Sequence, residues 1–251
     1  MKLMKLERQQ AIMDYLKQNH AASVAELSRL FFISETSIRR DLDKLERSGL
    51  LRKTYGGAIL LEGGNEVISL DARQQTEREA KANIARKAAD CIENGDVIFL
   101  DSSSTVLAMA AHLKRFTQLS VATNGLRMAC ELAELPGIKV FSLGGLVAPH
   151  TYSSNGALTL RALGDMRADK LFLSPKAVDD CIYCADEEET AVRRAMMERS
   201  REVYVLCSAN KLGRYAAFRL CALEDIDALI CDKPLTAEWS ARLSRSGVRV
   251  L

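Results

Sequence analysis

The fold is decided by residues 34–58, which read SETSIRRDLDKLERSGLLRKTYGGA. Ile38, Leu42 and Leu45 recur at spacings of four and three residues, which places them on one face of a helix. Ser34 stands just before this pattern, where a helix N-cap is expected. The stretch therefore predicts an amphipathic helix whose polar residues gather on the face opposite to the core.

Two short apolar runs follow this helix. Residues 50–55 (LLRKTY) and 58–61 (AILL) are strand-like, and Gly56-Gly57 between them is a turn signal. The pattern predicts a two-stranded β-wing that carries the polar side chains Arg52, Lys53 and Tyr55.

Two more helices are expected upstream. Residues 7–18 carry apolar side chains at helical spacing, and Ser23 with Glu26 matches a capping box at the start of a helix over residues 24–32. Three helices and a wing are enough to bury a small core. Residues 1–61 are therefore predicted to form a winged helix-turn-helix domain.

A domain of this kind reads duplex DNA mainly with the first turns of its last helix. The DNA-contacting residues expected here are Ser34, Glu35, Thr36, Ser37, Arg39 and Arg40 in the helix and Arg52, Lys53 and Tyr55 in the wing. Residues 1–57 hold 11 Lys and Arg against 7 Asp and Glu, a net charge of +4 (11 − 7), so the rest of the chain carries −2 of the total of +2. A basic head on a slightly acidic body fits a DNA reader. The alternative is a small protein-binding domain whose charges are merely solvated.

The head resembles the winged helix-turn-helix of the DeoR family of bacterial transcription regulators. The resemblance rests on residues 34–42 (SETSIRRDL) and 52–58 (RKTYGGA), although many members carry His where this chain has Tyr55. It implies a sequence-specific transcriptional regulator, usually a repressor of a carbohydrate-use operon, with double-stranded operator DNA as its partner.

Composition limits the class of protein further. Hydrophobic residues make up 48% of the chain and charged residues 27%, which is ordinary for a globular protein. The sequence has no apolar run long enough to span a bilayer, residues 1–6 lack the apolar segment of a signal peptide, and seven cysteines suit a reducing compartment. We expect a cytoplasmic protein with no membrane partner. Cys181 and Cys184 have CxxC spacing, but the three histidines do not stand at paired spacing, so we expect no metal and no cofactor.

The remainder of the chain alternates short apolar runs with helical segments. The runs lie at residues 96–100, 120–122, 139–143, 170–173, 202–206, 228–230 and 248–251. Continuous apolar strands separated by helices predict an α/β domain with a mostly parallel sheet that is covered on both faces. We assign residues 93–251 to this domain and residues 62–92 to a hinge and a charged linking helix. The alternative is that this helix belongs to the surface of the body.

Polar clusters follow the first three expected strands, and ligands collect at the carboxyl ends of parallel strands. The candidate effector-binding residues are Asp101, Ser102, Ser103, Ser104 and Thr105, then Asn124, then Gly144 and Gly145. Hydroxyl and N–H groups at a helix N-terminus favour an anion such as phosphate, but Ser and Thr are also ordinary helix caps. Asp101 is suited to accept hydrogen bonds from sugar hydroxyls, and the glycines would let the backbone approach a ligand.

These clusters extend the resemblance to the effector domains of the DeoR family, which are similar in fold to ribose-5-phosphate isomerase and coenzyme A transferase. Residues 188–196 (EETAVRRAM) and 210–214 (NKLGR) also match. The resemblance implies a phosphorylated sugar or related metabolite as effector, with Glu189 and Lys211 beside it. Residues 174–179 (SPKAVD) depart from the usual Gly-x-x-Gly-Ile-Asp. Lys176 in that segment either replaces lost positive charge or faces solvent.

A competing interpretation is a sugar-phosphate isomerase or transferase-like enzyme with an accessory DNA-binding head. Proton abstraction needs a carboxylate held in the pocket, for which Asp101, Glu188 and Glu189 are the candidates. The sequence offers no complete set of base, electrophile and phosphate clamp, so we assign no catalytic residue and favour a regulator. A head of +4 binds weakly alone, and paired heads suit repeated half-sites, so we expect a homodimer or homotetramer.

Overall fold

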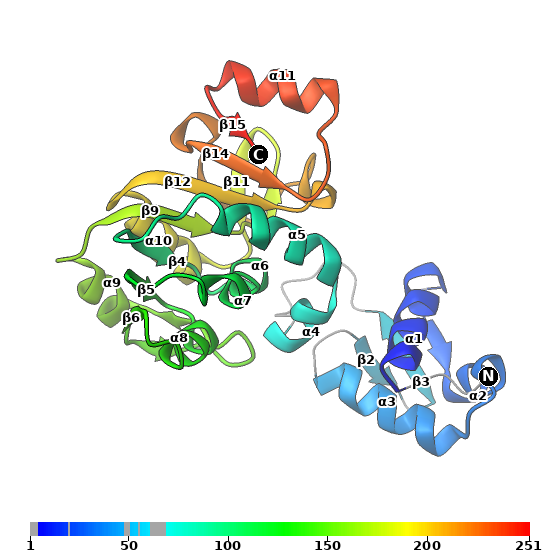
Figure 1. The fold of residues 1–251 in the computed structure, drawn as a ribbon. Coiled ribbons are helices and arrows are strands. Elements are labelled where there is room, and N and C mark those ends of the chain that lie inside the picture. Colours follow the sequence, from blue (N-terminus) through cyan, green and yellow to red (C-terminus); the bar gives the residue numbers. More distant parts are fainter. Residues whose placement is uncertain (1–4, 20, 48–50, 55, 61–68) are drawn as a thin grey trace. The chain divides into compact units, whose positions relative to one another are not determined.

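The computed structural model describes residues 5–19, 21–47, 51–54, 56–60 and 69–251 (Figure 1). The chain divides into two compact units, residues 1–75 and 76–251. The segment 62–92, which we expected to join head and body, is divided between these units, and its helical part from residue 76 onward belongs to the second. Among the described residues, the structure has no helix that is long and apolar enough to cross a membrane.

The first unit is a winged helix-turn-helix, as predicted. Its elements are α1 (Lys5–Asn19), β1 (Ala21–Ser23), α2 (Val24–Phe31), α3 (Glu35–Arg47), β2 (Leu51–Thr54), β3 (Gly57–Leu60) and α4 (Leu70–Gln75). The wing holds one strand more than expected, because β1 pairs antiparallel with β3 in the order β1-β3-β2. Gly57 permits this close pairing, since a Cβ atom there would lie 2.1 Å from the carbonyl oxygen of Ala22.

The core of this unit is built from the apolar faces of its helices. Ile12 and Leu16 of α1, Leu27 of α2, and Ile38 and Leu42 of α3 are fully buried against one another. Each side chain of this size contributes about 1.5–3 kcal/mol when it leaves water. The helical spacing in the sequence therefore identified the residues that hold the three helices together.

Both ends of α2 are fixed by local hydrogen bonds. At its start, Ser23 Oγ accepts the N–H of Glu26 (3.1 Å), and the Glu26 carboxylate accepts the N–H of Ser23 (3.3 Å), which completes the predicted capping box. At its end, Phe32 adopts a left-handed backbone (φ 54°) with its side chain 95% exposed. Ser28 Oγ donates to the carbonyl oxygen of Ile33 (2.6 Å), so the turn before α3 is held in one conformation.

The second unit is organised around a seven-stranded sheet in the order β15-β14-β12-β9-β4-β5-β6, in which every neighbouring pair is parallel (Figure 1). Its strands are β4 (Val97–Leu100), β5 (Leu119–Thr123), β6 (Ile138–Ser142), β9 (Ala168–Leu173), β12 (Ser200–Cys207), β14 (Ala228–Cys231) and β15 (Arg249–Val250). All seven coincide with predicted apolar runs, so the expected parallel sheet is confirmed.

Helices cover both faces of this sheet. They are α5 (Arg78–Ala89), α6 (Ser104–Leu107), α7 (Ala110–Leu113), α8 (Leu126–Ala133), α9 (Ala157–Leu163), α10 (Glu187–Met197) and α11 (Ala237–Arg245), with short 3₁₀ turns η1 (Ala209–Lys211) and η2 (Leu223–Asp225). Phe99 and Val205 pack in one core with Val192 and Met196 of α10. Because strand side chains alternate between faces, the residues next to Phe99 and Val205 point the other way, and α5 contacts β12 and β14.

Two small antiparallel sheets were not predicted. One pairs β7 (Leu146–Val147) with β8 (Ser154–Asn155), and the other joins β10 (Ala177–Val178), β11 (Cys181–Cys184) and β13 (Phe218–Ala222). Val178, Ile182 and Leu220 are buried in the same core as α10. The second small sheet thus extends the core and carries the CxxC pair on a strand.

Candidate functional site

The exposed face of α3 is the candidate DNA-binding surface. The expected contact residues Glu35, Thr36, Arg39 and Arg40 are exposed, as is Ser34 just before the helix, and Ser37 is half-buried. The carbonyl oxygen of Ser34 accepts the N–H of Ser37 (2.9 Å), which starts the helix. All six residues therefore lie at the surface at the start of α3.

The cationic side chains of this surface differ in whether they form ion pairs within the chain. Arg39 forms an exposed i,i+4 ion pair with Glu35 (3.3 Å), a type of contact that is worth little. Arg40 has no ion-pair partner among the described residues, so its guanidinium is available to phosphate or to a base edge. The Lys53 ammonium pairs with Asp43 of α3, which offsets part of the charge expected from the wing. Tyr55 and the side chain of Arg52 lie outside the described residues.

Asp41 is a structural residue that sequence reasoning did not single out. Its side chain is buried, where its carboxylate accepts hydrogen bonds from the guanidinium of Arg8 (2.5 Å) and the amide of Gln9 (3.2 Å) on α1. The hydrogen bond to Asp41 raises the pKa of Arg8 above its ordinary value. Asp41 therefore locks the recognition helix to α1, while its neighbour Arg40 faces outward.

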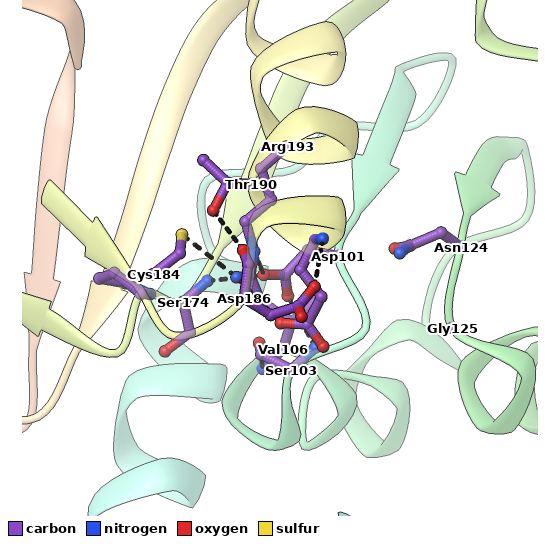
Figure 2. Close-up of polar contacts among 12 residues, drawn as sticks. Asp101, Ser103, Val106, Asn124, Gly125, Ser174, Cys184, Asp186, Thr190 and Arg193 are labelled. Atoms are coloured by element: carbon purple, nitrogen blue, oxygen red, sulfur yellow. Dashed lines mark hydrogen bonds and ion pairs between the residues drawn. The ribbon is translucent and has the colours of Figure 1, made fainter. Parts of the chain in front are cut away.

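In the second unit, Asp101 stands at the carboxyl end of β4 beside Asn124 at the end of β5, because Leu100 and Thr123 are register partners. Asp101 is 1% exposed. Its Oδ1 accepts the N–H of Ser103 (2.9 Å), and its Oδ2 accepts the N–H of Ser174 (3.1 Å) and Nε of Arg193 (2.9 Å), as Figure 2 shows. We expected Asp101 to accept hydrogen bonds from an effector. The chain already uses both oxygens, but a carboxylate has about four acceptor sites, so a contact between Asp101 and an effector stays a prediction.

Arg193 is the centre of a buried charged cluster that the sequence analysis missed. The guanidinium of Arg193 lies 3.3 Å from the Glu189 carboxylate and 3.3 Å from Sγ of Cys184. Burial acts to lower the pKa of Arg193, but Cys184, Asp101 and Glu189 outweigh it, so the pKa lies well above its ordinary value. The i,i+4 spacing of Glu189 and Arg193 on α10 was the available signal.

Lys211 contacts Ser174, the residue whose N–H donates to Asp101. Its Nζ donates to Ser174 Oγ (3.0 Å) and to the carbonyl oxygen of Pro175 (2.8 Å). Burial lowers the pKa of Lys211, and no carboxylate of the described chain lies within ion-pair distance of it. Lys176, by contrast, is exposed and contributes its backbone N–H to Tyr183 (2.8 Å). The side chain of Lys176 thus faces solvent, and a contact between Lys176 and an effector stays a prediction.

The hydroxyl-rich loop after Asp101 is buried throughout. Ser102, Ser103, Ser104 and Thr105 are each less than 10% exposed. Ser103 Oγ accepts the N–H of Val106 (3.3 Å) and so caps α6. This is the ordinary helix-cap role that the sequence left open as the alternative to anion binding.

The glycine pair after β6 serves two different purposes. Gly145 has a φ of 145°, and a Cβ atom there would lie 2.1 Å from Oγ1 of Thr159 on α9. The second glycine is therefore required for close packing against α9. A Cβ atom on exposed Gly144 would meet no atom of the described chain within 4 Å, although its carbonyl oxygen accepts the Thr159 hydroxyl (2.6 Å).

Asn124 joins the expected residues to a segment that was not predicted. Its backbone oxygen accepts the N–H of Ser154 (2.7 Å), and its Nδ2 donates to the Ser154 carbonyl (3.2 Å). Asn155 follows on β8, paired with Leu146 next to Gly145. The described structure gives Oδ1 of Asn124 and Oδ1 of Asn155 no hydrogen-bond partner, although both residues are buried. Residues 151–155 thus bring the polar ends of β5 and β6 together.

Glu77, at the start of the second unit, holds the loop that carries Lys211. Glu77 adopts a left-handed backbone (φ 55°), and its carboxylate lies 3.1 Å from Ser208 Oγ and accepts a hydrogen bond from the Asn210 amide. The N–H of Ala209 donates to Asp232 (2.8 Å). The loop from Ser208 to Lys211 is therefore fixed from both sides. Two surface depressions, one beside Arg194 and one beside Gly137, are not lined by residues of this loop.

Comparison with known proteins agrees with both units. The DeoR-like helix-turn-helix domain matches residues 8–63, and the DeoR C-terminal sensor domain matches residues 76–233. The chain is 33% identical to the transcriptional regulator GolR of Listeria innocua (97% of each chain covered) and 33% identical to the transcriptional repressor GlcR of Bacillus subtilis (98% and 95%). It is 30% identical to the glycerol-3-phosphate regulon repressor of Escherichia coli (91% of each). Among solved structures it is similar to ribose 5-phosphate isomerase A of Methanocaldococcus jannaschii, with a TM-score of 0.41 and 14% identity over 55% of each chain. The chain belongs to the DeoR family of helix-turn-helix transcriptional regulators.

Proposed function

We propose that this regulator represses genes of carbohydrate use and that a sugar phosphate or related metabolite controls its affinity for operator DNA. The effector would bind at the carboxyl edge of the sensor sheet, beside Lys211 and Asn124. The names of two relatives, a repressor and the repressor of a glycerol-3-phosphate regulon, support the assignment. Full-length similarity to these regulators supports it for the whole chain and not for the head alone.

The observation that carries the proposal is the state of Lys211. Its ammonium donates hydrogen bonds to neutral oxygens of Ser174 and Pro175, and burial lowers its pKa despite the opposing effect of the more distant Asp101 and Glu77. A phosphate group beside Nζ would supply the missing countercharge and favour the charged ammonium. Asp101, Glu189 and Arg193 already satisfy one another, so Lys211 is the cation of the cluster that remains for an anionic ligand.

The same geometry favours binding over turnover. A general base must have an oxygen free to take a proton from the substrate. Asp101 accepts three hydrogen bonds from the chain and pairs with Arg193, and Glu189 also pairs with Arg193, so both carboxylates have structural partners. Together with the regulators that make up its family, this supports a sensor that binds its ligand without converting it.

The effector acts by binding the two states of the protein with different affinity, since a ligand shifts an equilibrium only by that difference. We propose that binding weakens operator affinity. The four excess positive charges of residues 1–57 are too few for tight binding by one head, so two or four chains would share an operator. Such a protein works where the operator DNA is, in the cytoplasm.

The proposal is tested by fluorescence anisotropy of the full chain on a duplex selected from a random DNA pool. Glycerol 3-phosphate, ribose 5-phosphate and glucose 6-phosphate are titrated in, with the free polyol and sugars and inorganic phosphate for comparison. At least one phosphorylated compound should weaken DNA binding. Lys211→Met should bind the duplex as tightly as the wild type and lose that response.

Lys176→Met is the matched control, because it removes an exposed lysine near the same edge. It should respond like the wild type. A normal response from Lys211→Met, or a wild type that responds to none of the phosphorylated compounds, would contradict the proposal.

A further inference from the structure

We infer that Asn155, together with Asn124, forms a subsite for the uncharged, hydroxyl-bearing part of the effector. The inference rests on the function proposed above and specifies which end of the ligand each part of the site holds. Lys211 would receive the anionic group, and the two amides would receive the hydroxyl groups.

The two amide oxygens are the observation that carries the inference. Asn124 is 4% exposed and Asn155 is 3% exposed, yet Oδ1 of each has no hydrogen-bond partner in the described part of the chain. Leaving a buried polar atom without a partner costs about 1–3 kcal/mol, and most buried side-chain polar atoms are satisfied. Two such atoms lie at the ligand-binding edge of one sheet. A ligand that donates hydrogen bonds to them would remove this unfavourable free energy.

The orientation of each amide fixes what it offers. The Ser154 carbonyl is an acceptor only, so Asn124 must direct its amino group there and keep Oδ1 free. Asn155 Nδ2 lies 3.2 Å from Ser153 Oγ, a hydroxyl that can donate or accept. Exchange of the two amide atoms of Asn155 would leave its amino group unpaired instead. Either orientation leaves one polar atom of Asn155 for a ligand.

The backbone places the two residues at one location. Ser154 bonds to Asn124 through both its N–H and its carbonyl group, and Asn155 is the next residue. Asn155 pairs with Leu146, which follows the glycine pair at the end of β6. In Figure 2 the Asn124 amide points to the side of Asp101. The subsite therefore lies at the same sheet edge as the charged cluster.

The surroundings select the chemistry of the ligand. The side chains bonded around Asn155 are hydroxyls, with Thr151 Oγ1 2.8 Å from Ser153 Oγ, and they carry no charge. The free acceptor Oδ1 of Asn124 would repel a phosphate oxygen. An ammonium group would be buried without a carboxylate, which is costly. Hydroxyl groups, which donate without charge, are the group that fits.

The test compares the full-length wild type with Asn155→Leu, a replacement of similar size that cannot form a hydrogen bond. Isothermal titration calorimetry measures binding of glycerol 3-phosphate, ribose 5-phosphate, glucose 6-phosphate and inorganic phosphate. Asn155→Leu should bind the phosphorylated compounds about tenfold more weakly, the effect of one hydrogen bond of roughly 1.4 kcal/mol. Its affinity for inorganic phosphate should not change, and its unfolding midpoint without ligand should not fall.

Asn94→Leu is the matched control, because Oδ1 of Asn94 is satisfied by the N–H groups of Thr117 (2.9 Å) and Gln118 (3.2 Å). It should show the opposite pattern, with a lower unfolding midpoint and unchanged ligand affinity.

Equal affinity of Asn155→Leu and the wild type for the phosphorylated compounds would overturn the subsite and leave the proposed function intact. An equal loss for inorganic phosphate would assign Asn155 a structural role and also overturn it. If the wild type binds none of the phosphorylated compounds, the proposed function fails. The unfolding midpoint of Asn155→Leu then decides whether Asn155 serves folding or binding. A lower midpoint for Asn155→Leu would assign the amide to folding, whereas an equal or higher one supports a residue kept for binding.

Discussion

The two units use their polar residues in opposite ways. In the head, Thr36 and Arg40 are exposed on one face of α3, where a partner from outside the chain can reach them. In the sensor, Asp101 and Arg193 are buried and satisfied by each other across 92 positions of sequence. An exposed polar face is visible in the spacing along one helix, whereas a buried ion pair is assembled from segments that are distant in sequence.

The strongest test of this difference is the buried ion pair. Arg193→Met leaves Asp101 buried without its cation, so we expect the sensor to lose about 3–5 kcal/mol of stability. Urea unfolding followed by the fluorescence of Trp239, the single tryptophan, reports on the sensor. Arg194→Met, which removes the next and exposed arginine, is the control and should cost under about 1 kcal/mol. Similar losses in the two variants would contradict the buried role of Arg193.

A change in the head should act on binding and not on folding. Arg40→Ala should weaken operator affinity by about 1–3 kcal/mol, since Arg40 is exposed and lacks an ion-pair partner in the described chain. Anisotropy on the selected duplex measures the loss, and the Trp239 transition should stay in place. Arg201→Ala, an equal charge change on the exposed sensor surface, should leave DNA affinity nearly unchanged. Equal effects of the two changes would show that Arg40 acts only through net charge.

The buried sensor should also show in the pH dependence of stability. Burial raises the pKa of Cys207 to about 12, whereas the exposed thiol of the unfolded chain titrates near its ordinary value. Between these two values the folded state holds the proton and the unfolded state does not, so stability falls as pH rises, by about 1.4 kcal/mol per pH unit. Unfolding from about pH 8 to about pH 10.5 should show a smaller slope for Cys207→Ala than for the wild type.

Cys130→Ala, which changes an exposed thiol on α8, is the matched control for that series. Its slope should equal that of the wild type. A Cys207→Ala slope that equals the wild-type slope would mean that the thiol does not contribute to the pH dependence.

The smallest effect concerns the turn before the recognition helix. Phe32 occupies a left-handed conformation that favours glycine, and its side chain is 95% exposed, so little burial compensates for the backbone strain. Phe32→Gly should stabilise the head by roughly 0.5 kcal/mol, after the extra freedom of glycine in the unfolded chain is counted. Hydrogen exchange of the α2 and α3 amides measures it. Faster exchange would show that the aromatic side chain supports the turn.

The sequence predicted those parts of the fold that depend on neighbours along the chain. The Ser23 and Glu26 capping box, helix α3 and the seven parallel strands follow from local spacing and apolar runs. Arg193 was missed because its partner Asp101 is remote in sequence. The structural contacts of Asp101 with Ser174 and of Gly145 with Thr159 were not predicted, because they join separate segments of the chain.

Several of the unpredicted strands are too short for a period of two residues to be visible. β1 spans three residues between two helices, and β7 and β8 span two each. The Cys181 and Cys184 pair lies along β11, where residues three apart point to opposite faces of the strand.

The glycine pair after β6 has a consequence for how such a sensor can change its ligand over evolution. A mutation at Gly145 collides with α9 and would be removed by selection for folding, whatever it did for binding. A side chain at Gly144 meets no described atom within 4 Å and enters space near the sheet edge at little cost. Position 144 is therefore open to substitution and position 145 is closed to it, so, if the effector binds at this edge as proposed, position 144 is the one where directed evolution could change ligand preference.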